Sequence, residues 1–149
     1  MTIMLDLTKD SGIALDLTKA APGLSKVKLL LNWDEHPVHA ASTTQGFDLD
    51  LWAFALDANG KITTAAQICY FNNKSLYNGA VVLPRDNRTG AGTDDEEILI
   101  DLDKLPADVS SVALYAFVFD ATARQQHFGM VANANVKVIN NENGDVIAQ

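Results

Sequence analysis

Residues 47–56 read FDLDLWAFAL, an alternation of acidic and apolar residues that runs into a wholly apolar stretch. Such a segment is typical of a β-strand. The next residues, Asp57-Ala-Asn-Gly60, are a turn signal, because glycine readily adopts the positive φ that tight turns require. Further strand candidates lie at residues 27–33, 62–71, 80–83, 98–102, 112–119 and 131–139, and short helical turns are predicted at residues 106–110 and 121–126. This pattern predicts an all-β fold, an antiparallel β-sandwich with long acidic loops and at most short helical turns.

The N-terminal residues contain a short internal repeat. The string Leu-Asp-Leu-Thr-Lys occurs at residues 5–9 and again at residues 15–19, and Asp10-Ser11-Gly12 between the copies favours a turn. The sequence therefore predicts a β-hairpin here, with one strand in each copy. Residues 112–119 (VALYAFVF) are apolar on both faces, as expected of a central strand that is covered on both sides.

The composition limits the class of protein. The chain has 149 residues, 48% of them hydrophobic and 20% charged, so it can form one domain with a real core. Eleven Lys and Arg residues against nineteen Asp and Glu residues give a formal net charge of −8, which disfavours nucleic acid as a partner. The sequence lacks both an apolar run of ~20 residues and a secretory-signal pattern, so we expect a cytoplasmic protein.

The densest polar segment is residues 85–97, RDNRTGAGTDDEE. It holds five carboxylates against two arginines, and its two glycines let the backbone fold tightly enough to bring distant acids together. Crowded carboxylates repel one another unless a positive charge lies among them, and calcium tolerates the irregular oxygen geometry that a loop provides. The alternative is a solvated acidic surface loop.

Asp48 and Asp50 lie two residues apart on the predicted strand, so both side chains project from the same face. Because Trp52, Phe54 and Leu56 continue that face, we expect the two carboxylates to lie at the mouth of an apolar core. Burying two anions there is costly unless they are paired or bound to a metal. The alternatives are that they lie beyond the core in water, or that they pair with a Lys or Arg.

Other polar residues at strand ends are candidate ligands that would have to come from separate loops, because the spacing does not match an EF-hand. They are Asp34, Asn72, Asn73 and Asp120, and each of them could equally cap a strand or start a turn. If the strands simply ran up and down, Asp48 and residues 85–97 would lie at opposite ends. Their meeting therefore requires a crossover, or a segment 80–83 that does not span the sandwich.

Motifs for transition metals and catalysis are weak or absent in the sequence. Cys69 is the only cysteine, which excludes an internal disulfide framework and a cysteine-based metal cluster, and its apolar neighbours predict an inert buried thiol. His36 and His39 could hold zinc, but Pro37 breaks any helix that would align the two rings. The common catalytic motifs are missing, so we do not expect an enzyme; a hydrolase built on scattered carboxylates is the weakest alternative.

The chain also carries a series of short motifs in a fixed order. They are the Leu-x-Leu-Thr-Lys strings, Leu31-Asn-Trp-Asp34, Phe47-Asp-Leu-Asp50, Tyr70-Phe-Asn-Asn73, Asp86-Asn-Arg-Thr-Gly90 with Gly92, Asp94-Asp-Glu96, and Asp120-Ala with Arg124 and Phe128-Gly129. This series resembles the TerD family of tellurium-resistance and stress-response proteins over nearly the whole chain.

The resemblance implies a β-sandwich that binds calcium ions (Ca²⁺) through strand-end and loop acids. The implied ligands are Asp48, Asp50, Asp86, Asn87, Asp94, Asp95 and Glu96, with Asn72, Asp34 and Asp120 as further candidates. It also implies a non-enzymatic module of a tellurite-resistance or stress-response system. The implied partners are other proteins of a stress-response complex, and the implied location is the cytoplasm or the inner membrane surface. The alternative is a metal-independent acidic module that binds other proteins.

The sequence departs from the family pattern in three places. The acidic loop is about one residue shorter between Gly92 and Asp94, and residues 35–45 differ. Family members usually continue past the equivalent of Ala148 with further strands. The resemblance therefore implies a single TerD-like domain over residues 1–149, with two alternatives: a trimmed domain without those C-terminal strands, or a sheet edge left open for a partner strand.

Overall fold

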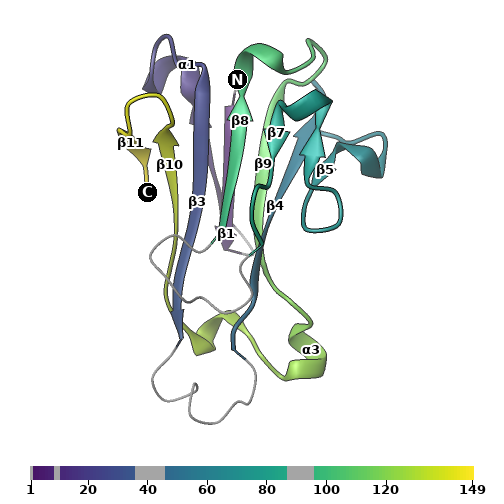
Figure 1. Cartoon of the computed structure of the whole chain (residues 1–149), viewed down its shortest axis with the longest axis vertical. Coiled ribbons are helices and arrows are strands. Elements are labelled where there is room, and N and C mark those ends of the chain that lie inside the picture. Colours follow the sequence, from purple (N-terminus) through teal and green to yellow (C-terminus); the bar gives the residue numbers. More distant parts are fainter. Residues whose placement is uncertain (1, 9–10, 36–45, 87–95) are drawn as a thin grey trace.

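The computed structural model describes residues 2–8, 11–35, 46–86 and 96–149, which form two packed β-sheets (Figure 1). Sheet A has five strands in the order β2-β1-β9-β4-β5, and sheet B has six in the order β11-β10-β3-β8-β7-β6. The strands of sheet A are β1 (Thr2–Thr8), β2 (Ser11–Asp16), β4 (Leu49–Leu56), β5 (Ile68–Cys69) and β9 (Ser111–Val118). Those of sheet B are β3 (Lys26–Glu35), β6 (Ser75–Leu76), β7 (Val81–Val82), β8 (Glu96–Asp101), β10 (Val131–Asn140) and β11 (Val146–Ala148). The predicted all-β sandwich is confirmed, with one parallel pair, β1 with β9, among antiparallel neighbours.

The helices are single turns. They are α1 (Leu17–Ala20), α3 (Ala121–Arg124) and the 3-10 turns η1 (Ala65–Gln67), η2 (Tyr77–Gly79), η3 (Leu102–Lys104) and η4 (Phe128–Met130). The prediction at residues 121–126 is confirmed by α3. The prediction at residues 106–110 is wrong, because this segment makes one hydrogen-bonded turn, from Val109 N to the Pro106 carbonyl, and does not continue. No helix in the described part of the chain is long and apolar enough to cross a membrane.

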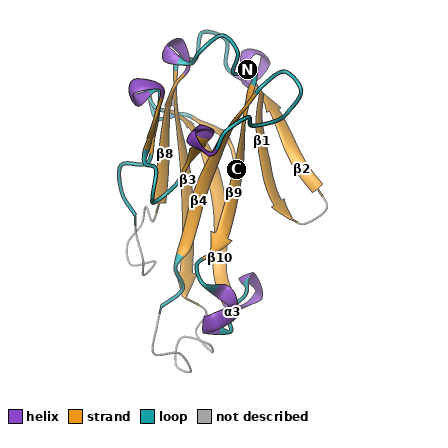
Figure 2. Cartoon of the chain, turned by 90° about the vertical axis from the view of Figure 1, so that its right-hand side faces the viewer, coloured by secondary structure: helices purple, strands orange, loops and turns teal. Residues whose placement is uncertain are grey.

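The N-terminal hairpin is confirmed, although its second strand begins and ends earlier than predicted. β1 and β2 pair antiparallel with Leu5 opposite Ile13, and Figure 2 shows them extending the sheet of β9 and β4. The second Leu-Asp-Leu-Thr-Lys copy is divided, because β2 ends at Asp16 and α1 begins at Leu17. Leu17 is buried in the core, which ends the strand by turning the chain inward.

The strand predicted at residues 62–71 is mostly wrong. Only Ile68–Cys69 pairs with β4, and the preceding residues form η1, in which Thr64 and Gln67 make a reciprocal capping box. The turn at Asp57–Gly60 is present, with Gly60 at φ +71°, but it leads into this loop and not into a hairpin. Consequently β4 pairs with β5 only at Ala53 and Phe54, and the other residues of β4 have no strand partner on that side among the described residues.

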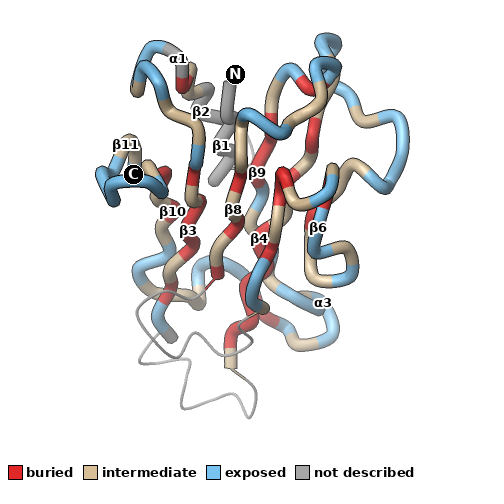
Figure 3. The backbone as a smooth tube through the Cα atoms, turned by 45° about the horizontal axis from the view of Figure 1, so that its top comes forward, coloured by how far each residue is buried: buried red, intermediate tan, exposed pale blue. Residues whose placement is uncertain are grey.

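The core lies between the sheets, where inward-facing residues of β3, β4, β8, β9 and β10 meet (Figure 3). Trp33 of β3 is fully buried, and its indole N–H donates a 2.9 Å hydrogen bond to the Phe47 carbonyl just before β4. This bond connects the two sheets at the end where Asp48 and Asp50 lie. Cys69 is also fully buried, and burial raises the pKa of its thiol to about 11, as predicted for an inert thiol.

The two faces of β4 are the reverse of the sequence prediction. The core face is Phe47, Leu49, Leu51, Ala53 and Ala55, all buried in the core cluster. Asp48, Asp50, Trp52 and Phe54 therefore lie on the opposite face, and the expectation that they border the core is wrong. Both faces of this strand are apolar beyond Asp50, so hydrophobicity could not identify the inner one.

β9 is the central strand of sheet A, as predicted, but it is not covered on both faces. Val112 and Leu114 are buried in the core, whereas Tyr115 and Phe117 are 38% and 41% exposed. Sheet A thus presents an aromatic outer face.

Candidate metal centre

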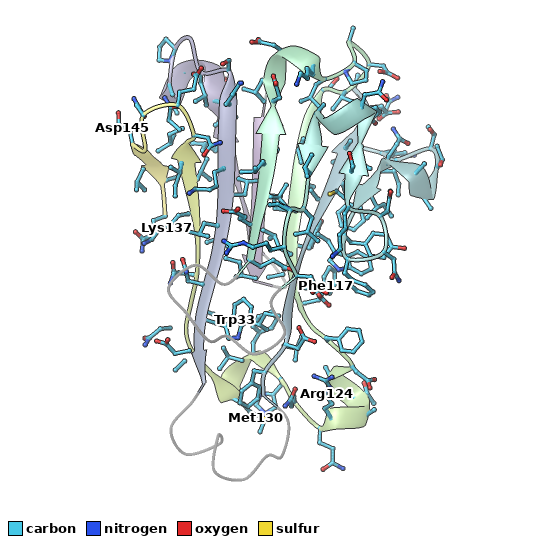
Figure 4. All side chains as sticks on the ribbon, in the orientation of Figure 1. Trp33, Phe117, Arg124, Met130, Lys137 and Asp145 are labelled. Carbon is cyan, nitrogen blue, oxygen red and sulfur yellow. The ribbon has the colours of Figure 1, made fainter. Side chains whose placement is uncertain are left out.

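The candidate site lies where β4 begins, at the end of the sandwich that also carries α3 (Figure 4). Asp48 and Asp50 come from the start of β4, and Asp86 comes from the segment that follows β7. We call these three residues the acidic triad. Each of them offers one carboxylate oxygen, and these oxygens all lie within 4.8 Å of one another.

The acidic triad lines a cavity of about 230 Å³ together with Phe71, Asn72, Phe119 and Arg124. Asp48 is 6% exposed and Asp50 is 4% exposed, and Asp86 is half-buried. The alternative that Asp48 and Asp50 lie in open water is therefore wrong. Their carboxylates are held where water cannot solvate them fully.

Local structure brings the triad together. The Phe119 backbone N–H at the end of β9 donates a 2.8 Å hydrogen bond to the Asp48 carbonyl, which fixes the start of β4. β7 is only two residues long, so residues 80–83 do not span the sandwich, which was one of the two alternatives that would allow Asp86 to reach this end. A further hydrogen bond, from Leu83 N to the Lys74 carbonyl at 2.9 Å, fixes the segment that leads to Asp86.

Glu96, at the start of β8, is buried beside the triad at 2% exposure. Leu51 lies in the part of β4 that does not pair with β5, and its backbone N–H donates a hydrogen bond to Glu96 Oε2. Glu96 Oε1 has no hydrogen-bond partner among the described residues. Burial, and secondarily the nearby charges of Asp50, Asp86 and Asp48, raise the pKa of Glu96 to about 9. In this arrangement Glu96 is protonated at neutral pH, and a cation bound to the triad would lower its pKa.

Arg124 is a site residue that the chemical reading of the sequence did not identify. Its Nη1 lies 4.0 Å from Asp48 Oδ2, and its guanidinium lies 5.0 Å from the centroid of the Phe119 ring. α3 places it there, since the Arg124 backbone N–H donates to the Asp120 carbonyl at 2.9 Å. The motif Asp120-Ala with Arg124 could have indicated this position. One helical turn directly after β9 places residue 124 near the end of that strand.

The remaining predicted ligands fall into three groups. Asn72 lines the cavity. Asp34 and Asp120 are not among the lining residues: Asp34 lies on β3, where Asn133 Nδ2 donates a 3.0 Å hydrogen bond to it, and Asp120 precedes α3 at φ +51°. Asn87, Asp94, Asp95 and the histidines His36 and His39 lie outside the described residues, as does the shortened part of the acidic loop.

The donor set of the cavity fits a hard divalent cation. Carboxylate and amide oxygens are the ligands that calcium prefers, whereas zinc sites are usually built from histidine and cysteine. Among the described residues that line the cavity, the triad carries a formal charge of −3 and Arg124 a charge of +1, which leaves −2. One divalent cation would balance this remaining charge. The alternative of pairing with an arginine is met at Asp48 by Arg124, at 4.0 Å, which is the outer limit of an ion pair.

Fold and site together define a small β-sandwich with a buried acidic cavity at one end. The model of the TerD domain matches residues 1–149, and the chain belongs to the TerD domain family.

Named relatives agree with this membership. General stress protein 16U of Bacillus subtilis is 40% identical over 135 residues, which are 90% of this chain and 68% of the relative. Tellurium resistance protein TerD of Serratia marcescens is 37% identical over 147 residues, which are 97% of this chain and 74% of the relative. The crystal structure of a homologue of telluride resistance protein (TerD) from Streptomyces coelicolor superposes with a TM-score of 0.64 at 25% identity, covering 82% of this chain and 69% of that one.

Proposed function

We propose that this protein is a calcium-binding, non-enzymatic module of a TerD-type stress response. The observation that carries the proposal is the acidic triad: three carboxylates within 4.8 Å of one another, two of them almost fully buried, with Arg124 as one nearby cation. Repulsion among three such carboxylates amounts to several kcal/mol at an effective dielectric of about 20. A bound Ca²⁺ would remove that repulsion.

Calcium fits this donor set better than magnesium. The ligands come from three separate segments and include the amide side chain of Asn72, so the geometry is irregular. Calcium accepts six to eight oxygens in such geometries, whereas magnesium requires near-ideal octahedral geometry and retains its waters. Asp48, Asp50 and Asp86 are the proposed direct ligands, with Asn72 beside them. Glu96, which is buried beside the triad, would influence the charge of the site without binding the ion directly.

The proposed cellular role follows from the relatives, whose names describe tellurium resistance and general stress response. We place the partners of this protein among other proteins of such a stress-response system, in the cytoplasm or at the inner membrane surface. Metal binding would then alter the surface around the mouth of the cavity, which such a partner would contact.

A calorimetric titration tests calcium binding directly. The protein, first treated with chelator and desalted, is titrated with calcium and separately with magnesium. We expect saturable calcium binding and magnesium binding at least tenfold weaker. Asp101→Asn serves as the control, because it removes one carboxylate that is paired with Lys104 at 3.2 Å and lies outside the cavity lining; it should bind calcium as the unmodified chain does.

The opposite result would favour the metal-independent module. If neither ion produced saturable heat, calcium binding would be rejected. The cation–π contact of Arg124 with Phe119 would then be the functional feature of the cavity mouth.

A further inference from the structure

Arg124 and a calcium ion in the acidic triad would bind the same carboxylate. The Nη1 atom of Arg124 lies 4.0 Å from Asp48 Oδ2, and Asp48 is one of the proposed calcium ligands. Both residues line the cavity, and the Arg124 side chain is only 22% exposed, so water screens its charge incompletely. A cation that enters the triad therefore meets a positive charge that is already in place.

The guanidinium of Arg124 has a second contact that does not depend on Asp48. It lies 5.0 Å from the centroid of the Phe119 ring, which attracts a cation through its π face. An ion pair at 4.0 Å is weak, whereas calcium binds carboxylate oxygens directly and carries twice the charge. Asp48 would therefore exchange the guanidinium for the ion, and Arg124 would keep its contact with Phe119.

The helix that carries Arg124 is held by few contacts. α3 is a single turn without a buried residue, and it lies between Asp120 at φ +51° and Gln125 at φ +53°. Residues other than glycine rarely adopt these left-handed conformations, which persist only where surrounding contacts hold them. The ion pair of Arg124 with Asp48 is one such contact, because it joins α3 to the start of β4. Its loss would loosen α3.

We propose that Arg124 is a built-in competitor of calcium. The guanidinium and the ion exclude each other at Asp48, so Arg124 limits the calcium affinity of the cavity and separates from Asp48 when the ion binds. This inference rests on the proposed calcium site. It couples the occupancy of the cavity to α3, whose Thr122 and Ala123 are exposed at the surface.

Calorimetric titration of Arg124→Gln with calcium tests the competition. We expect its calcium affinity to be at least tenfold higher than that of the unmodified chain, because charges of +1 and +2 that are ~6 Å apart lower an affinity about tenfold even at the dielectric of bulk water. Arg124→Lys keeps the positive charge and should bind calcium as weakly as the unmodified chain. Lys104→Gln is the matched control, because it removes one positive charge from an exposed residue outside the cavity lining; it should leave the affinity unchanged.

Hydrogen exchange of the unmodified chain, followed by NMR in chelator and in saturating calcium, tests the separation without any substitution. The Arg124 backbone N–H donates a 2.9 Å hydrogen bond to the Asp120 carbonyl within α3. We expect this amide to exchange faster in calcium, because α3 has then lost its ion pair with β4. The Phe119 amide, which donates to the Asp48 carbonyl, should not exchange faster.

The possible outcomes separate this inference from the calcium site itself. Saturable calcium binding that a folded Arg124→Gln leaves unchanged or weakens would overturn the competition, and the calcium site would stand. Equal exchange of the Arg124 amide in both buffers would overturn the separation. Failure of both the unmodified chain and Arg124→Gln to bind calcium would reject the site and the inference together. Binding by Arg124→Gln alone would support the competition and would mean that Arg124 keeps calcium out of the unmodified cavity.

Discussion

Asp50→Asn is expected to abolish the thermal stabilisation that calcium gives to this protein. A ligand that binds only the folded state stabilises it by about 2.7 kcal/mol at one hundred times its Kd, which corresponds to a rise in Tm of roughly 5–10 °C for a domain of this size. The variant removes one of the two most buried carboxylates of the triad, so its Tm should move by less than about 1 °C over the same calcium range. Differential scanning calorimetry in chelator and in calcium measures both shifts.

The same variant gives a second, opposite signal without the metal. In chelator, Asp50→Asn should melt at or above the temperature of the unmodified chain, because an amide replaces a buried carboxylate that repels Asp48, Asp86 and any ionised Glu96. The matched control Asp101→Asn should keep the full calcium shift. If Asp50→Asn retained that shift, Asp50 would not be a ligand.

Glu96→Gln is expected to stabilise the calcium-free protein at neutral pH. The pKa of Glu96 is raised from 4.5 to about 9 in the folded state, so folding favours the protonated acid. The protein therefore loses stability as the pH rises from the unfolded pKa toward the folded one, and none of this loss is present below about pH 4.5. Glutamine imitates the protonated acid and still accepts the hydrogen bond from the Leu51 N–H.

The expected difference in unfolding free energy is near zero at pH 4 and about 3 kcal/mol in favour of Glu96→Gln at pH 7, at 1.36 kcal/mol per pKa unit. Denaturant unfolding in chelator across this pH range measures it. Glu97→Gln is the matched control, because Glu97 is the next residue of β8 but pairs with Arg85 at the surface. A constant difference between the unmodified chain and Glu96→Gln from pH 4 to pH 8 would contradict the assigned pKa.

Much of this fold could be predicted because period-two patterns and turn residues are local signals. The strands at β3, β4, β8, β9 and β10 were all expected near their observed positions. The errors occurred where tertiary packing decides. The apolar positions on both sides of Trp52 gave no local reason to prefer one face of β4. Residues 62–67 carry strand-forming side chains, yet the capping pair Thr64 and Gln67 makes them a 3-10 turn and loop.

The candidate site could be predicted in part. Asp48 and Asp50 were identified because alternating acids share one face of a strand, and Asp86 because glycines follow it in an acidic loop. The pairing of Asp86 with them depends on the shortness of β7, which the sequence leaves open. The contact of Arg124 with Asp48 depends on the direction of a four-residue helix. The exposure of Tyr115 and Phe117 was missed because β9 was expected to be covered on both faces.

The most direct test of the metal site is a crystal structure of the protein grown with calcium, with anomalous scattering recorded to locate the ion. We predict one anomalous peak in the cavity, with oxygens of Asp48, Asp50 and Asp86 each about 2.3–2.6 Å from it. No peak in saturating calcium, with the Arg124 guanidinium closed onto the three carboxylates instead, would contradict the proposed calcium site.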